Sequence, residues 1–348
     1  MKNKTIAIVF GAQSYEHEIS IVSAIAMKKV LQHKLVYIFI DQNRSFYEIP
    51  ADIIKSNLFS SGQYKKFGQL YLEKKGFFKK TLFGMKKLEF DVVLNLTHGG
   101  DGEDGVLASL FKFYEIPFIG PRVEASVVSF NKYLTKMYAK ECGVKTIDYE
   151  YYTKDDEINI ENFPVIIKPV RLGSSIGISI VHSKEELDYA LDVAFEFDDA
   201  IIVEPFCKGI KEFNLAGTKA NGEYLFSMVE EPSKGDILDF DKKYLDFNRT
   251  SQAQEAKVSK ELINALEDSF KKLYNNLFEG ALIRCDFFVL DGEVYINEIN
   301  PIPGSMSNYL FSDFNSIITT ILENLPKVNL IPINYEYVNT IQQAKGKA

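Results

Sequence analysis

The segment DFFVLDGEVYINEINPIPGS, residues 286–305, decides the fold of this chain. Two runs rich in β-branched and aromatic residues flank Leu290-Asp291-Gly292, and this pattern predicts a β-hairpin. The strand ends that lie away from the turn carry Asp286, Glu298 and Asn300. The question is what three oxygen-bearing side chains do at the end of an otherwise apolar hairpin.

The length of the hairpin loop determines which side chains share a face. A two-residue turn at Asp291-Gly292 would place Asp286 and Glu298 on opposite faces. We predict a three-residue loop that ends at a left-handed Gly292 and pairs position 286 with 296 and 284 with 298. The side chains that then point the same way are Arg284, Asp286, Glu298 and Asn300.

Two carboxylates and a carboxamide on one face suit Mg²⁺, a hard cation that prefers oxygen ligands. Arg284 beside them would neutralise developing negative charge. The alternative is a solvated hairpin face that carries acids without a ligand. The apolar residues around this set make that alternative weaker without removing it.

Length and composition indicate a globular protein of two or three domains. The chain has 348 residues, 46% apolar and 25% charged. Its apolar runs are too short for a secretory signal or a membrane span. Its three cysteines, Cys142, Cys207 and Cys285, are odd in number and far apart, which argues against a disulfide framework and a zinc site. We therefore expect a cytoplasmic protein with no membrane partner.

The charge pattern argues against a nucleic-acid partner. The formal net charge is -8, from 48 acidic and 40 basic residues, so the chain lacks a global electrostatic footprint for nucleic acid. One basic cluster, interleaved with aromatic residues, lies in residues 65–88. A solvated outer face of β-strands, with lysines on an edge, is the favoured explanation over RNA binding.

Apolar runs alternate with helical patterns in the first third of the chain. Buried strands are expected at 5–10, 35–40 and 90–96, with a helix at 106–114. Such alternation predicts an α/β domain with a doubly wound parallel sheet, whose functional loops follow the carboxyl ends of the strands. We assign residues 1–121 to this amino-terminal, Rossmann-like substrate domain.

Two further domains are expected after Pro121. Residues 122–203 read as a small α/β lid, with strands at 164–169, 177–181 and 200–206. Residues 204–348 read as a carboxyl-terminal α+β domain that includes the hairpin. A polar loop at 231–256 interrupts it, and loops of that length are usually functional.

A Gly/Ser loop follows the strand that ends at Lys168. Its residues 173–177 allow backbone N–H groups to approach an anion closely. The chain has neither a P-loop motif nor a G-x-G-x-x-G after its first strand. Taken alone, this loop is a weak signal, and an ordinary tight hairpin explains it better than an anion site.

Several residues in order along the chain resemble the ATP-grasp fold, in which a nucleotide lies between a small lid and a carboxyl-terminal domain. They are Lys132, Lys168 before the Gly/Ser loop, Glu204 at a strand end, and the R-x-D and E-x-N patterns of the hairpin. Three more stretches, GAQSYEHEIS (11–20), HGGDGEDG (98–105) and NPIPGS (300–305), make the chain similar to the D-alanine–D-alanine ligase family. The amino-terminal domain then corresponds to the pre-ATP-grasp domain. The resemblance implies an ATP-dependent carboxylate–amine ligase that joins two D-alanines through a D-alanyl phosphate, for peptidoglycan precursors.

The resemblance also assigns the nucleotide site. It implies ATP and Mg²⁺, with two ions per site and Mn²⁺ able to substitute. The implied metal ligands are Asp286, Glu298 and Asn300. The implied nucleotide-binding residues are Lys132, Lys168, Ser174, Ser175, Glu204, Glu212 and Lys243. Glu212 is the less secure of these, because its stretch is one residue longer than the family pattern.

The substrate site follows from the same resemblance. Glu16 would hold the ammonium of the first D-alanine, although a first-turn helix-dipole partner is its alternative. Arg284 and the backbone N–H of Gly304 would form an oxyanion hole. The remaining implied residues are Ser174 and Tyr244, which bond to Glu16, and His98, near the first substrate. The alternative for His98 is a purely structural role, which is the more common one for a lone histidine. The alternative for Asp101, Glu103 and Asp104 is to cap the next helix.

One position departs from the family pattern. The family usually has a serine nine residues after Asn300, whereas this chain has Tyr309, with Ser307 nearby. The second substrate subsite is therefore open, and a ligase for D-lactate or D-serine is an alternative that Tyr244 argues against. A non-catalytic nucleotide-binding protein is the alternative from another class. A homodimer is expected from the resemblance alone.

Overall fold

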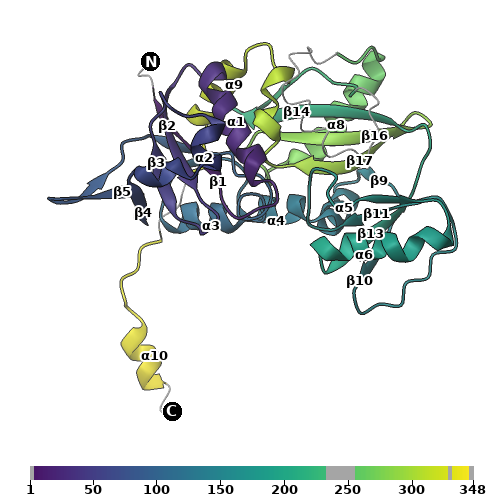
Figure 1. Cartoon of the computed structure of the whole chain (residues 1–348), viewed down its shortest axis with the longest axis horizontal. Coiled ribbons are helices and arrows are strands. Elements are labelled where there is room, and N and C mark those ends of the chain that lie inside the picture. Colours follow the sequence, from purple (N-terminus) through teal and green to yellow (C-terminus); the bar gives the residue numbers. More distant parts are fainter. Residues whose placement is uncertain (1–3, 233–254, 328–330, 345–348) are drawn as a thin grey trace.

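The computed structural model describes residues 4–232, 255–327 and 331–344. Its strands form three sheets of eight, four and five strands, and Figure 1 shows the largest sheet at the amino-terminal end of the molecule. The strands of the largest sheet are β1 (Thr5–Gly11), β2 (Lys34–Ile40), β3 (Phe46–Ile49), β4 (Gln69–Glu73), β5 (Gly76–Thr81), β6 (Gly84–Lys87), β7 (Val92–Asn95) and β8 (Phe118–Ile119).

The centre of this sheet is parallel, as the sequence predicts. The parallel strands run in the order β2-β1-β7-β8, and Ile6 of β1 lies opposite Leu35 and Val92. The helix α1 (His17–Val30) packs its buried side chains on the face of β1 that carries Ile6 and Ile8. The helix α3 (Val106–Phe113) covers the opposite face. Helices on both faces explain why β1 is a continuous apolar run.

The rest of the sheet differs from the predicted parallel pattern. Strands β3 to β6 add on in antiparallel order, with β6 at the edge. Short loops join β2 to β3, β4 to β5 and β5 to β6, and a short loop cannot make the crossover that a parallel neighbour needs. The predicted basic cluster lies on this extension, and β6, which carries Lys86 and Lys87, is fully exposed. Between β3 and β4 lie the helices α2 (Ser56–Ser60) and η1 (Gln63–Lys66).

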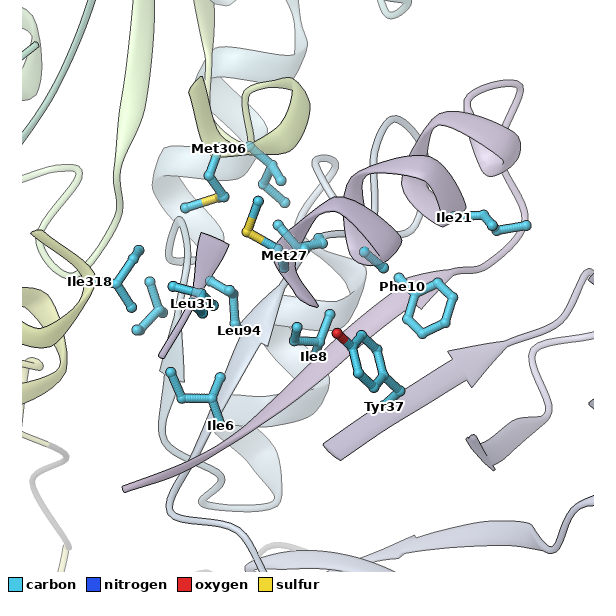
Figure 2. Close-up of a cluster of buried hydrophobic side chains, with 14 of the residues drawn as sticks. Ile6, Ile8, Phe10, Ile21, Met27, Leu31, Tyr37, Leu94, Met306 and Ile318 are labelled. Carbon is cyan, nitrogen blue, oxygen red and sulfur yellow. The ribbon is translucent and has the colours of Figure 1, made fainter. Parts of the chain in front are cut away.

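The core of the amino-terminal sheet includes residues from near the end of the chain. The 3₁₀ segment η4 (Gly304–Leu310) and the helix α9 (Phe314–Glu323) contribute Met306 and Ile318 to the cluster of buried side chains around β1. Figure 2 shows Met306 and Met27 of α1 in this cluster. The turn after the hairpin is therefore built against α1, although some 280 residues separate Ser23 from Ser305 in sequence.

The lid holds the four-stranded sheet. Its strand order is β10-β13-β11-β12, and all pairs are antiparallel. The strands are β10 (Glu150–Thr153), β11 (Val165–Pro169), β12 (Ser179–Val181) and β13 (Ala200–Pro205). The turn η2 (Lys184–Glu186) and the helix α6 (Leu187–Phe197) cover one face through Leu187, Ala190 and Ala194.

The third sheet carries the hairpin. Its strand order is β15-β14-β16-β17-β9. The strands are β9 (Lys145–Thr146), β14 (Lys211–Ala220), β15 (Glu223–Phe226), β16 (Ile283–Leu290) and β17 (Glu293–Asn300). The helix α8 (Lys260–Tyr274) packs Leu266, Phe270 and Leu273 on this sheet, the stripe that the sequence predicts as core.

Two helices connect the domains. The helices α4 (Val123–Phe130) and α5 (Lys132–Glu141) contribute Ala125 and Ala139 to the core of the third sheet, and β9 pairs with β17. We propose domain boundaries at residues 121 and 203.

The helix α10 (Val338–Ala344) lies apart from the three sheets in Figure 1. No helix in the described part of the chain is both long and apolar enough to cross a membrane.

Candidate active site

The hairpin turn is shorter than predicted. Leu290 pairs with Glu293, so the turn is the two-residue Asp291-Gly292, and the predicted three-residue loop is wrong. Both turn residues are left-handed, with φ of 51° and 83°. This is the backbone of a type I′ turn, whose twist matches that of the strands and for which Asp-Gly is a preferred pair.

A β-bulge restores the facing that the loop length alone would lose. The register shifts between Asp286 and Phe287, so that Asp286 pairs with Glu298 while Phe287 pairs with Ile296. Asn297 is the extra residue on β17. The predicted pairs 286–296 and 284–298 are therefore wrong, and the observed pairs are 286–298 and 284–300. Directly opposed residues share a face, so all four side chains still point the same way.

The four side chains interact at this end of the hairpin. Arg284 donates from Nε to Asp286 Oδ1 at 2.6 Å and from its terminal nitrogen to Oδ2 at 2.7 Å. Asn300 Nδ2 also donates to Asp286 Oδ2, at 3.0 Å. Burial raises the pKa of Tyr309, and the nearby charge of the Arg284 guanidinium opposes that rise. Burial lowers the pKa of Arg284, but the Asp286 carboxylate outweighs it and holds the pKa well above its usual value.

The donor set fits a magnesium ion. Asp286 and Glu298 are cross-strand neighbours, and Asn300 touches Asp286, so two carboxylates and a carboxamide oxygen gather at one end of two strands. Hard oxygen donors of this kind are what Mg²⁺ prefers. Among the described residues, no group of three or more His, Cys, Asp or Glu side chains could hold a metal ion. A site here therefore depends on the amide of Asn300 and on ligands that a substrate supplies.

A buried ion triad lies where the lid meets α5. Glu204 at the end of β13 receives Lys168 of β11 at 2.6 Å and Lys136 of α5 at 2.5 Å. Lys168 also donates to Oδ1 of Asn297, the bulged residue, at 3.3 Å. The bulge thus turns Asn297 toward a predicted phosphate-binding lysine and links the lid to the hairpin.

Lys132 lies where the three sheets converge. Its ammonium donates to the backbone carbonyl of Leu172, at the start of the Gly/Ser loop. Burial lowers its pKa, and the charged groups that act on it are Glu298, Lys168, Glu16 and Glu204. Each of these four is a predicted site residue, and together they come from all three sheets and the loops beside them. The structure therefore brings the predicted cations and acids into one site.

Glu16 faces the Gly/Ser loop of the lid. It lies in the loop between β1 and α1 and is only 7% exposed. The Ser174 hydroxyl donates to Glu16 Oε1, and a Cβ at Gly173 would lie 3.0 Å from the same oxygen. Burial, with the charge of Glu103, raises the pKa of Glu16 to about 7, although the Ser174 hydrogen bond opposes the shift. The carboxylate is thus turned toward the lid, which the helix-dipole explanation does not require.

The loop after β7 places His98 and its acidic neighbours. His98 is 3% exposed, its Nδ1 lies 3.5 Å from Glu103 Oε1, and burial lowers its pKa. Burial raises the pKa of Glu103 to about 8. Asp104 accepts from the backbone N–H of Val106 at 2.9 Å, and Asp101 pairs with Arg44 at 2.9 Å. The capping alternative is therefore correct for Asp104, whereas Glu103 faces the histidine.

Gly304 begins a tight turn after the hairpin. Ser305, Met306 and Ser307 have φ of 48°, 55° and 48°, so three consecutive residues other than glycine are left-handed. The Ser307 hydroxyl is buried and has no hydrogen-bond partner among the residues that the structure describes. Tyr309 follows on the same segment, close enough to Arg284 for the two to influence each other's pKa.

The remaining predicted residues are Lys243, Tyr244, Glu212 and Ser175. Lys243 and Tyr244 fall within 233–254, outside the described residues. Glu212 lies on β14 opposite Phe288. Ser175 shares the left-handed conformation of Ser174, with φ of 60°.

The structure adds residues that the sequence reasoning missed. Lys136 is one helical turn from Lys132, so a check of the i, i+4 position could have found it. Nothing local marks Asn297 as a bulge. Ser23 lies on the buried face of α1, where its Oγ accepts from the backbone N–H of Ser305 at 3.0 Å.

Comparison with known proteins places the chain in a family. Residues 5–121 match the family model described as D-ala D-ala ligase N-terminus, and residues 139–319 match the model described as D-ala D-ala ligase C-terminus. The D-alanine–D-alanine ligase of Wolinella succinogenes is 59% identical over 343 residues, which cover 98% of this chain and 99% of that protein.

Solved structures share the fold. The structure of D-alanine–D-alanine ligase from Helicobacter pylori is 47% identical with a TM-score of 0.84, and the match covers 94% of this chain and 100% of that one. The VanG D-Ala:D-Ser ligase of Enterococcus faecalis has a TM-score of 0.73 at 24% identity, over 93% and 98% of the two chains, which shows the fold alone. The family models, the identity to full-length relatives and the fold agree that this chain belongs to the D-alanine–D-alanine ligase family, with the ATP-grasp fold.

Proposed function

We propose that this chain joins two D-alanines at the expense of ATP, through a D-alanyl phosphate, and so supplies a peptidoglycan precursor. The observation that carries the proposal is the set of contacts that joins the three sheets at one place. Ser174 of the lid loop donates to Glu16, and Lys168 pairs with Glu204 and donates to Asn297 of the hairpin. Membership of the family, with relatives that match over nearly their full length, supports the same reaction.

The phosphates of ATP would lie between Lys132, Lys168 and the hairpin end. The buried ammonium groups would offset phosphate charge where little water screens them. Asp286, Glu298 and Asn300 would hold Mg²⁺, two ions in the family pattern with Mn²⁺ able to replace them. A metal held by these three side chains would supply the positive charge that phosphoryl transfer requires. Glu204 and Glu212 would contact adenosine, and Lys243 would add a third cation.

The first D-alanine would lie between Glu16 and Arg284. The Glu16 carboxylate accepts a hydrogen bond from Ser174 and would accept another from Tyr244. It would hold the ammonium of D-alanine and leave the carboxylate of D-alanine to face ATP. His98 would line the same pocket. Attack by the second amine creates a negative oxygen, which Arg284 and the Gly304 N–H would stabilise as an oxyanion hole. The enclosing Gly/Ser loop, with Ser175, would keep water from the acyl phosphate.

The second D-alanine would place its carboxylate near Tyr309 and Ser307. The Tyr309 side chain is close enough to Arg284 for the two to influence each other's pKa, so its hydroxyl would reach the acyl centre without a backbone shift. The buried Ser307 hydroxyl offers a second donor. A D-lactate or D-serine acceptor is the alternative, since the VanG structure shows that this fold is shared by a D-Ala:D-Ser ligase.

The assembly and location of the protein are further proposals. We propose a cytoplasmic homodimer, on the strength of the family resemblance. ATP, a substrate of this reaction, is a cytoplasmic metabolite, which supports the location.

Phosphate release from ATP, measured with D-alanine, L-alanine and D-lactate singly and in pairs, tests the proposal. We expect release with D-alanine alone and little with L-alanine or D-lactate alone. Product analysis of the D-alanine and D-lactate mixture then identifies the acceptor. Phosphate release that does not depend on D-alanine would favour a nucleotide-binding protein without ligase activity.

A further inference from the structure

Ser23 of α1 bridges two parts of the site that no sequence motif connects. Its Oγ lies 2.9 Å from His98 Nε2 and accepts the backbone N–H of Ser305 at 3.0 Å. The side chain is almost fully buried, at 1% exposure. The hydroxyl therefore joins the loop after β7 to the first left-handed residue after Gly304.

Hydrogen-bond counting favours one direction for this bridge. A serine hydroxyl has one hydrogen to donate and lone pairs with which to accept. Because Ser305 N–H occupies a lone pair, the hydroxyl hydrogen is satisfied when it points at an unprotonated His98 Nε2. The remaining ring proton then lies on Nδ1, which faces Glu103 Oε1 at 3.5 Å. The order Glu103, His98, Ser23, Ser305 is a continuous polar chain that runs through a buried region.

The turn that Ser23 holds is strained. Left-handed residues other than glycine are unfavourable, and three in a row persist only where the surroundings hold them in place. Met306 is packed into the same buried cluster as Met27 of α1, as Figure 2 shows. Ser23 adds a directional tether to that apolar contact. The strained turn carries Gly304, whose N–H must face the reacting carbonyl if it is an oxyanion donor.

We propose that Ser23 is a positioning residue that couples His98 to the Gly304 turn and so aims the oxyanion-hole N–H. The inference rests on the proposed function, since it needs Gly304 to serve the tetrahedral intermediate. An oxyanion donor acts only if it points to where the charge develops. A variant in which this turn is released from α1 would still bind ATP, because the residues predicted to bind ATP lie in other segments.

The variant Ser23→Ala tests this role, with Ser20→Ala as its matched control. Ser20 lies on the same helix, is equally buried, and also accepts a backbone N–H, that of Gly11 at 2.8 Å. Its hydroxyl donates to Leu96 and does not reach the turn. Both variants remove one buried hydroxyl, so thermal unfolding reports whether they lose comparable stability.

We expect Ser23→Ala to lower kcat by about tenfold to a hundredfold, the range typical of small misplacements of catalytic groups. The KM for ATP should stay unchanged, and Ser20→Ala should keep the wild-type kcat. A phosphinate analogue of the dipeptide, whose tetrahedral phosphorus carries the same oxyanion, should lose affinity for Ser23→Ala by a similar factor. Ser23→Cys, which keeps the size but bonds weakly, should give an intermediate kcat.

Equal kcat values and equal phosphinate affinities for Ser23→Ala and Ser20→Ala would overturn the inference. So would a loss of activity in both variants that follows their stability. A wild-type protein that fails to release phosphate with D-alanine would instead overturn the proposed function, so the two failures are distinguishable.

Discussion

The buried triad of Lys136, Glu204 and Lys168 makes the sharpest prediction for stability. The Lys136 and Glu204 side chains are 2% and 3% exposed and lie 2.5 Å apart. Removal of one partner from a buried ion pair costs about 3–5 kcal/mol, because a charge is left without its partner. In Lys136→Met the carboxylate keeps Lys168 at 2.6 Å, so we expect the lower end, about 3 kcal/mol.

The variant Glu204→Gln should be worse. It leaves two buried ammonium groups that face a neutral amide, and we expect a loss of about 5 kcal/mol. At roughly 1–2 °C per kcal/mol for a chain of this length, Tm should fall by roughly 3–6 °C for Lys136→Met and further for Glu204→Gln. The double variant holds a single unpaired ammonium, so its loss should be smaller than the sum of the two single losses.

Thermal unfolding by calorimetry at neutral pH measures these differences. The control is Lys145→Met, since Lys145 also pairs with a glutamate, Glu293 at 2.8 Å, but both side chains are more than half exposed. Exposed pairs contribute about 0–1 kcal/mol, so its Tm should scarcely change. The reasoning would be refuted if Lys136→Met had the same Tm as the Lys145→Met control. It would also be refuted if the stability loss of the double variant equalled the sum of the two single losses.

The same triad has a pH signature. Burial raises the pKa of Glu204, but the two lysines outweigh burial and hold the net pKa below its usual value. A carboxyl group with a lowered pKa contributes stability above its ordinary pKa, and that contribution is lost as the pH falls through the lowered value. The Tm of the wild type should therefore fall more steeply in acid than that of Glu204→Gln.

Three further predictions concern activity. Asp286→Asn and Glu298→Gln should each abolish ligation, since each loses charge at constant volume, and Asp286→Asn should also lower Tm, because it leaves the Arg284 guanidinium without its carboxylate partner; turnover like that of the wild type would discredit the proposed metal site. The pKa of Glu16 is about 7, and the ionised form is needed to hold an ammonium, so kcat/KM for D-alanine should fall below about pH 7; in Ser174→Ala, which loses a hydrogen bond that lowers this pKa, the fall should begin at higher pH. Tyr309→Phe should raise the KM for the second D-alanine and leave that for ATP unchanged, and equal constants for both proteins would remove Tyr309 from the second subsite.

Much of the fold could be predicted because its signals are local. The apolar run of β1 and its neighbours indicates a parallel sheet centre covered on both faces, and the helical stripe at Leu266, Phe270 and Leu273 indicates the core of the third sheet. The sequence pattern of β3 to β6 did not show whether these strands continue the sheet in antiparallel or in parallel order. Which strands pair depends on loops and on burial that no single stretch encodes.

The hairpin shows where local rules stop. The prediction that Asp286 and Glu298 share a face was correct. The feature that places them there is a bulge at Asn297 combined with a type I′ turn, not the predicted three-residue loop. Turn length and bulge each shift the register by one residue, and sequence alone cannot separate the two. The contact of Asn297 with Lys168 gives a physical reason for the bulge, yet it involves a residue of another sheet.

The residues missed in the site are those whose partners are distant in sequence. Lys136 meets Glu204 across 68 positions, and Ser23 meets Ser305 across 282. Neither residue belongs to a motif, so each became visible only when the sheets were in place. Glu16 and Arg284, by contrast, stand inside recognisable stretches.

The most direct test of the central claim is the ratio of dipeptide to phosphate when D-alanine is the only amino acid supplied with ATP and Mg²⁺. Our account predicts that each phosphate released is matched by one D-alanyl-D-alanine. Phosphate without dipeptide, or no response to D-alanine at all, would contradict it.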